Sequence, residues 1–199
     1  MNPLNKLIAA SCGALLMCAS LRAGDKPASA PKPMPKSSAP ASAPAAMPEM
    51  PKPGPEHAHL RKWAGTWDAA VKDYMMGKMI PGTGVWTCDG QLGFWVTCDY
   101  TGFSANGLFQ GHEVMGYDTH AKMYTAYWVD TMGDFSMPMN GTMAGNVMTW
   151  TGKAPGMDGK MMEWKMTTTW MDDDHASFEM WMLGEKPMKV LEIAYSRRK

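Results

Sequence analysis

The stretch Met162-Glu163-Trp164-Lys165-Met166-Thr167-Thr168-Thr169-Trp170 decides the fold class. Apolar or methyl-bearing side chains stand at every second position, and charged or small polar side chains alternate with them. A period of two is typical of a β-strand with one buried face and one solvated face. We therefore predict a half-buried strand over residues 162–170.

Similar runs recur through the second part of the chain, and turn-forming pairs such as Pro81-Gly82 and Asp158-Gly159 separate them. About ten short strands at regular spacing predict an all-β protein, an antiparallel meander that closes into a barrel of about eight to ten strands. Residues 56–64 are predicted to form a short helix before the first strand. The further predicted strands are residues 67–76, 84–88, 94–100, 108–117, 123–130, 135–143, 147–151, 177–182 and 188–195.

The first residues have the layout of a secretory signal peptide. A short segment with one lysine precedes an apolar run over residues 7–21, and Arg22-Ala23-Gly24 follows it. The run has about 15 residues, fewer than the roughly 20 that span a bilayer as a helix. We predict that residues 1–23 are removed and that the protein is exported, periplasmic or secreted. Bulky Met17 before Cys18, and the short apolar run before Cys12, argue against a lipoprotein tether at either cysteine.

Residues 24–55 are rich in Pro, Ala, Lys and Ser and contain no aromatic side chain. Such a composition cannot bury a core and favours an extended polyproline II linker, so we predict a disordered spacer. All Trp, Tyr and Phe residues follow, which predicts one folded domain over residues 56–199.

The charge balance and the motif content exclude several function classes. The chain has 19 Lys and Arg against 19 Asp and Glu, so it lacks the basic surplus of a nucleic-acid-binding protein. It also lacks the GxSxG, HExxH, GxxxxGKS/T and CxxC motifs. Asp118, Asp130 and Asp134 are the acids nearest to aromatic residues at strand ends, but no base or nucleophile accompanies them, and turn roles are favoured. No catalytic residue is assigned, and an enzymatic function stays open.

Cys88 and Cys98 flank a predicted hairpin centred near Gly93, at equal distances from that centre. Directly opposite residues of an antiparallel pair lie close enough to be bridged by a disulfide. In an exported protein we predict that the two cysteines are oxidised.

The apolar faces of the strands predict a binding function. A barrel of about ten strands has an interior large enough for side chains and one small ligand. We predict a non-enzymatic protein that takes a small apolar or amphipathic molecule into the barrel. The predicted lining residues are Trp86, Trp128, Met162, Trp164, Met166, Phe178 and Met180.

The high methionine content, 23 residues, leaves a second interpretation open. Thioether side chains select Cu(I), so a copper-binding or oxidant-protective protein is the alternative function, with copper as its cofactor. Met is also a flexible core filler, and this interpretation is favoured for most of these residues. A weak alternative metal site combines His57 and His59 with Met47 and Met50.

Gly65-Thr66-Trp67 resembles the G-x-W signature that opens the first strand of lipocalins and other calycin barrels. The resemblance implies that Trp67 lies at the closed end of the barrel under an arginine of the last strand, Arg197 or Arg198. A more extensive resemblance, to the bacterial family called domain of unknown function 1579, covers residues 57–199. It includes Leu92-Gly93, Gly116-Tyr117-Asp118, Gly141-Thr142 and Asp158-Gly159. It implies a calycin-like barrel with no assigned activity. Phe94 departs from the arginine that the family often carries there.

Overall fold

The computed structural model describes residues 49–156 and 158–199, and Pro48–Lys199 forms one compact unit. The predicted signal peptide and most of the predicted linker lie outside the described residues. Within the described part, no helix has the length and the apolar character needed to cross a membrane.

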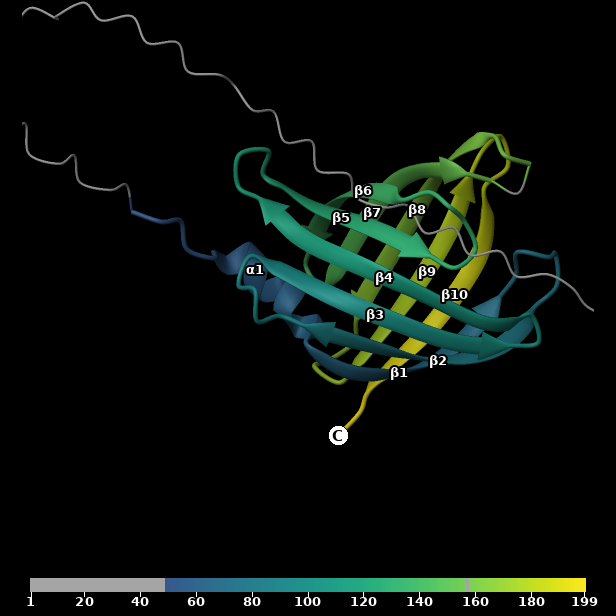
Figure 1. The fold of residues 1–199 in the computed structure, drawn as a ribbon, viewed down its shortest axis with the longest axis horizontal. Coiled ribbons are helices and arrows are strands. Elements are labelled where there is room, and N and C mark those ends of the chain that lie inside the picture. Colours follow the sequence, from purple (N-terminus) through teal and green to yellow (C-terminus); the bar gives the residue numbers. More distant parts are fainter. Residues whose placement is uncertain (1–48, 157) are drawn as a thin grey trace, which may run out of the picture. The chain divides into compact units, whose positions relative to one another are not determined.

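The unit is a closed antiparallel barrel of ten strands with one short helix before the first strand, which confirms the predicted fold class (Figure 1). Each strand pairs with its neighbours in the sequence, and the first strand pairs with the last to close the barrel. The elements are α1 (Pro55–Leu60), the 3-10 turn η1 (Arg61–Trp63), β1 (Gly65–Asp73), β2 (Ile80–Asp89), β3 (Trp95–Ser104), β4 (Gly107–Asp118), β5 (Met123–Asp130), β6 (Met137–Ala144), β7 (Val147–Pro155), β8 (Met161–Trp170), β9 (His175–Leu183) and β10 (Met188–Arg197).

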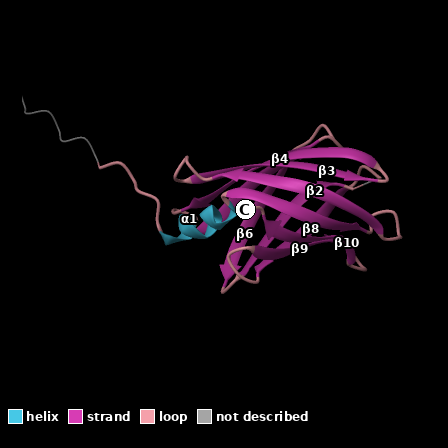
Figure 2. Cartoon of the chain, turned by 90° about the horizontal axis from the view of Figure 1, so that it is seen from below, coloured by secondary structure: helices cyan, strands magenta, loops and turns pink. Residues whose placement is uncertain are grey.

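The helix defines one end of the barrel (Figure 2). Contacts join α1 to β3 and β4, and the ring of His57 packs against Phe94 and Tyr117, at the start of β3 and near the end of β4. We call this the helix end and the opposite opening the far end. The far end is formed by the β1–β2, β3–β4, β5–β6, β7–β8 and β9–β10 connections.

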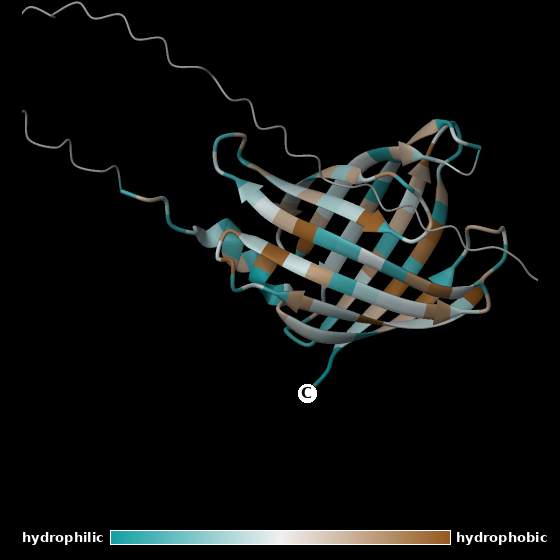
Figure 3. Ribbon diagram, viewed as in Figure 1, coloured by the Kyte–Doolittle hydropathy of each residue, from teal (hydrophilic) through white to brown (hydrophobic). Residues whose placement is uncertain are grey.

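Burial alternates along the strands as the sequence pattern predicts, and hydropathy alternates with it (Figure 3). In β8, Trp164, Met166, Thr168 and Trp170 are buried, whereas Glu163 and Lys165 are exposed. The inward side chains of all ten strands form the core, because each strand presents one face to the inside of the barrel.

One predicted turn is wrong. Pro81 and Gly82 lie within β2, opposite Lys72 and Val71 of β1. Proline is tolerated there because it is the second residue of the strand, where a missing N–H disturbs the ladder least. A side chain at Gly82 would meet the Phe103 carbonyl oxygen at 3.1 Å, so glycine permits the close approach of β3. The true β1–β2 connection comes earlier, around Gly77, whose φ is 76°.

Candidate functional site

Arg197 and Trp67 close the helix end of the barrel. The Arg197 guanidinium lies 4.1 Å from the centre of the Trp67 ring, in cation–π geometry. It donates hydrogen bonds to the carbonyl oxygens of Ala64, at 2.6 Å, and Lys62, at 2.7 Å. The guanidinium nitrogen of Arg197 would lie 3.1 Å from a side chain at Gly65, whose φ is 114°. Glycine at this position therefore leaves room for the arginine.

The helix side chains seal the same end. Trp67 is fully buried and its indole N–H donates to the Trp63 carbonyl at 2.8 Å. His57, a residue of the weak alternative metal site, is 1% exposed, and its Nδ1 accepts the Gly54 N–H at 2.9 Å. His59 instead contacts the Tyr124 hydroxyl, with 3.1 Å between Nδ1 and the oxygen. The two histidines thus have different partners.

The predicted disulfide is present. Cys88 and Cys98 are directly opposite in the β2–β3 register, with sulfur atoms 2.06 Å apart and Cα atoms 4.1 Å apart. Both are buried on the inner face. The bond fixes the β2–β3 hairpin near the helix end.

The seven predicted lining residues lie on inward-facing strand positions, but they differ in burial. The burial of the inward side chains differs between the two ends of the barrel. Near the helix end the inward side chains of Trp67, Met115, Met148 and Trp170 are almost completely buried. Toward the far end many inward residues are only half-buried. Of the predicted set, Trp86, Trp164 and Met166 are buried, and Trp128, Met162, Phe178 and Met180 are half-buried.

Glycines let several aromatic rings lie flat against the inner wall. A side chain at Gly84 or Gly102 would meet Tyr100 at 2.3 Å or 2.6 Å, and one at Gly111 would meet Trp128 at 2.2 Å. Glycines of the same strand or of a neighbouring strand therefore provide the surface on which each ring rests. A ring that lies flat along the wall takes up less space at the centre of the barrel than a ring that points toward the barrel axis.

Trp128 forms the centre of an aromatic stack. Its ring is stacked with Trp86, with centroids 5.9 Å apart, and with Phe109, with centroids 6.2 Å apart. Its indole N–H donates to Asp130 at 2.6 Å, and Asp130 also accepts the backbone N–H of Met132 at 2.7 Å. Asp130 thus has a turn and positioning role, as the sequence interpretation favoured.

Glu113 is an interior acid to which the sequence analysis assigned no role. It lies on β4 between Cys98 of β3 and Trp128 of β5, and it shares an inward face with Met115. Burial raises the pKa of the Glu113 carboxyl to about 8, although the side chain is only half-buried. The inward direction of Glu113 could have been predicted from the sequence, because Glu113 is two residues before the buried Met115 and the two side chains therefore face the same side of the strand.

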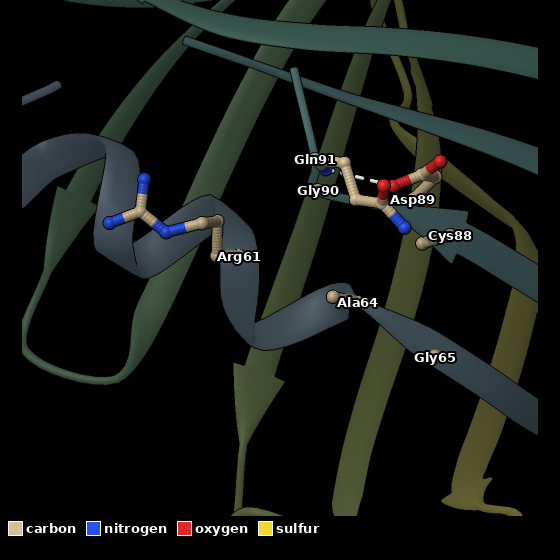
Figure 4. A pocket seen from close by; sticks show the side chains of 7 residues that line it. All are labelled: Arg61, Ala64, Gly65, Cys88, Asp89, Gly90 and Gln91. Carbon is tan, nitrogen blue, oxygen red and sulfur yellow. Dashed lines mark hydrogen bonds between the residues drawn. The ribbon is translucent and has the colours of Figure 1, made fainter. Parts of the chain in front are cut away.

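Two surface pockets flank the helix end, and none of the seven predicted residues lines either of them. The first lies between η1 and the β2–β3 connection, and its lining includes Arg61, Asp89 and Gln91, with the Arg61 guanidinium directed away from the other two side chains (Figure 4). The second lies between α1 and β4, β5 and β6, and Tyr124 is part of its lining. The Tyr124 hydroxyl donates to the Glu56 carbonyl at 3.3 Å. Both pockets follow the seam where the helix meets the barrel.

Exposed apolar side chains gather on the connections of the far end and the adjoining strand ends. They come from all five of these connections or their immediate flanks. The set consists of Met76, Met79, Phe103, Leu108, Met132, Phe135, Met161 and Met188. We call it the apolar rim.

The predicted metal residues are not brought together as a set within the described part. Met50 is 77% exposed, Met47 lies outside the described residues, and the two histidines have the partners given above. Among the described residues, no group of three or more His, Cys, Asp and Glu side chains could hold a metal ion. Copper binding through methionines stays a prediction.

The remaining acidic candidates belong to turns. Asp118 accepts the backbone N–H groups of His120, at 2.8 Å, and Ala121, at 2.9 Å. These bonds lower the pKa of its carboxyl, chiefly the one from Ala121. Asp134 is exposed in the β5–β6 connection.

A ten-strand antiparallel barrel, opened by Gly65-Thr66-Trp67 and closed by an arginine over that tryptophan, is a calycin-like barrel. The chain belongs to the family described as protein of unknown function DUF1579, whose family model matches residues 52–197. The resemblance predicted from sequence is therefore confirmed.

One solved structure agrees on the fold, and a second is a weaker match. The crystal structure of Rv2717c from M. tuberculosis is 14% identical, with a TM-score of 0.55, covering 74% of this chain and all of that one. The structure of EF1p2_mFAP2b bound to DFHBI is 8% identical, with a TM-score of 0.43, and covers 71% of this chain and 98% of that one. No curated protein sequence matches the chain significantly.

Proposed function

We propose that this protein is a non-enzymatic carrier that binds one small apolar or amphipathic molecule inside the far half of its barrel. The observation that carries the proposal is the difference in burial between the two ends of the barrel. The helix end is sealed by Trp67, Trp63 and Leu60, whereas toward the far end half-buried side chains such as Met162 and Met182 lie beside buried ones such as Val190.

The chemistry of the far half suits such a ligand. Flat aromatic rings at Tyr100 and Trp128 offer stacking surfaces. Met162, Met180 and Met182 add side chains that adjust their shape at low cost, because methionine is unbranched and polarizable. The apolar rim gives an apolar molecule a path from outside to these residues, and exposed apolar patches of this kind often mark binding surfaces.

The experiment is a titration with the neutral fluorescent probe N-phenyl-1-naphthylamine. We expect one molecule bound per chain, with enhanced probe emission. Met180→Trp places a larger ring among the half-buried interior residues and is expected to weaken binding at least about tenfold. Met171→Trp, at an exposed turn position, is the matched control and is expected to change nothing. No saturable binding by the wild-type chain would refute the proposal, as would equal binding by both variants.

We also propose that the protein is exported after removal of residues 1–23, to the periplasm or the medium. The Cys88–Cys98 disulfide supports an oxidising compartment. Mass spectrometry of the chain expressed in a bacterial host with its own N-terminus tests this. We expect a mass that begins near Gly24 and is lower by two hydrogens than the reduced form. A chain that keeps Met1 and free thiols would refute export.

A further inference from the structure

Glu113 is a carboxyl inside an apolar barrel with no basic partner. Its neighbours in the sheet are Cys98 and Trp128, and Cys98 is in the disulfide. Among the described residues no ion pair or hydrogen bond involves the Glu113 carboxyl, and burial alone shifts its pKa. A buried carboxylate is costly unless a cation or hydrogen-bond donors compensate it.

The basic side chains of the described strands cannot supply that compensation. Lys72, Lys153, Lys165 and Lys189 stand at outward positions of β1, β7, β8 and β10. The inward-facing Arg197 is committed at the helix end to Trp67 and to two backbone carbonyls. The described part of the chain therefore provides no counter-ion for an ionised Glu113 carboxylate in the interior.

Electron-rich rings surround the same region. Trp128 is directly opposite Glu113 in the β4–β5 register and stacks on Trp86, and Trp86 contacts the rings of Tyr100 and Tyr195. Trp86 Nε1 is buried and has no hydrogen-bond partner among the described residues. The faces of indole and phenol rings attract cations, and the attraction grows when water is excluded.

We propose that the physiological ligand is an organic cation, an aromatic or amphipathic molecule with an ammonium group, whose charge pairs with Glu113 beside the stacked rings of Trp86 and Trp128. This inference rests on the proposed function, because it names the ligand class of the same interior. The apolar part of the ligand then extends toward the far end, among the half-buried methionines.

Binding of such a cation depends on pH. The pKa of Glu113 is raised to about 8, so the carboxyl of the free protein is mostly protonated at neutral pH. The titratable groups that face it are Tyr100 and Tyr195, and Asp130 lies farther along β5. Burial raises the pKa of Tyr100 to about 12 and that of Tyr195 well above its usual value, so both stay neutral. Affinity for a quaternary cation is therefore expected to rise at least about tenfold between about pH 6.5 and pH 8.5, as Glu113 ionises.

The test uses two ligands of the same shape, neutral tert-butylbenzene and cationic phenyltrimethylammonium, with intrinsic tryptophan fluorescence as the readout. At about pH 8.5 we expect the cation to bind at least about tenfold more tightly to the wild-type chain. Glu113→Gln, which keeps the shape of the protonated carboxyl, should remove this preference and the pH dependence while leaving tert-butylbenzene binding within about twofold. Glu163→Gln, on the outer face of β8, is the matched control and should retain the preference.

The outcomes separate the two proposals. Binding of tert-butylbenzene without preference for the cation would overturn the cation inference and leave the carrier function standing. A cation preference that survives in Glu113→Gln would also overturn the assignment to Glu113. Failure of both molecules and of N-phenyl-1-naphthylamine to bind would overturn the carrier function itself.

Discussion

The two halves of this barrel are built from the same strands but differ in how their interiors are packed. At the helix end, Trp67 packs under Arg197 and the interior is closed by Trp63 and Leu60. At the far end, Met162, Met180 and Met182 are half-buried, and a carboxyl without a partner among the described residues, Glu113, lies deeper between the halves. The difference teaches that tight packing is concentrated at the helix end, whereas the far half keeps features that cost stability, and the proposed binding function gives a reason for them.

The largest effect is expected from Trp67→Ala. The indole is fully buried and its N–H is bonded to the Trp63 carbonyl, so its removal leaves a cavity, an unpaired carbonyl and an arginine without its ring. We expect a loss of about 3–5 kcal/mol in the free energy of unfolding, measured by urea denaturation. Tyr127→Ala, on the outer face and 55% exposed, is the control and should cost less than about 1 kcal/mol. Equal losses would contradict the central packing role of Trp67 at the helix end.

The next effect is expected from removal of the disulfide in the double variant Cys88→Ala/Cys98→Ala. The bond links residues 10 apart in sequence, and a loop of this size is worth about 2–3 kcal/mol through the entropy of the unfolded chain. Thermal unfolding without reductant should show the loss. In the presence of dithiothreitol the variant and the wild type should unfold at nearly the same temperature. A difference that persists in reductant would mean that packing of the sulfur atoms, and not the cross-link, stabilises the hairpin.

The barrel was predictable from the sequence because each strand and hairpin is specified by residues that are close together in the chain. Alternation over residues 162–170 specifies a strand and its buried face, and the equal distances of Cys88 and Cys98 from Gly93 specify their register. The local pattern gave a wrong prediction at Pro81-Gly82. This pair favours a turn, but pairing with the neighbouring strands β1 and β3 keeps it within the sheet.

The candidate site was only partly predictable, because it depends on distant partners. The seven apolar lining residues follow from strand phase alone. The buried state of His57 depends on Phe94 and Tyr117, and the flat orientation of Tyr100 depends on glycines of two strands. Glu113 combines a feature that the sequence predicts with one that depends on distant residues. Its inward phase can be read from the sequence, whereas the lack of a basic partner can be read only from the closed barrel.

Glu113→Gln is expected to stabilise the far half in a pH-dependent manner. The folded-state pKa of Glu113, about 8, lies above the usual value of 4.5 for a glutamate, so the folded protein binds the proton more tightly than the unfolded chain does. The wild type therefore loses stability as pH rises from about 4.5 to 8, whereas the variant does not. Because the side chain keeps part of its surface free, we expect a gain of about 2 kcal/mol for the variant at about pH 9 and almost none at about pH 5.

Chemical denaturation at the two pH values measures this gain. Glu163→Gln on the outer face serves as the control and should follow the wild type at both. A gain of equal size at both pH values would mean that the effect comes from packing. A loss at high pH would mean that the Glu113 carboxylate is stabilised in the folded chain, which would contradict the absence of a counter-ion.

The smallest effect compares one substitution in the two halves. Met115→Leu changes a side chain that is 2% exposed near the helix end, where close packing leaves little room for the branched shape. We expect it to cost about 1 kcal/mol. Met180→Leu changes a half-buried interior side chain whose neighbourhood is less tightly packed, and it should cost less than about 0.5 kcal/mol. Urea denaturation of the two variants in parallel measures the difference. If Met180→Leu proves as costly as Met115→Leu, the far half is packed like the helix end, and the space that the ligand needs must then come from rearrangement of the barrel during binding.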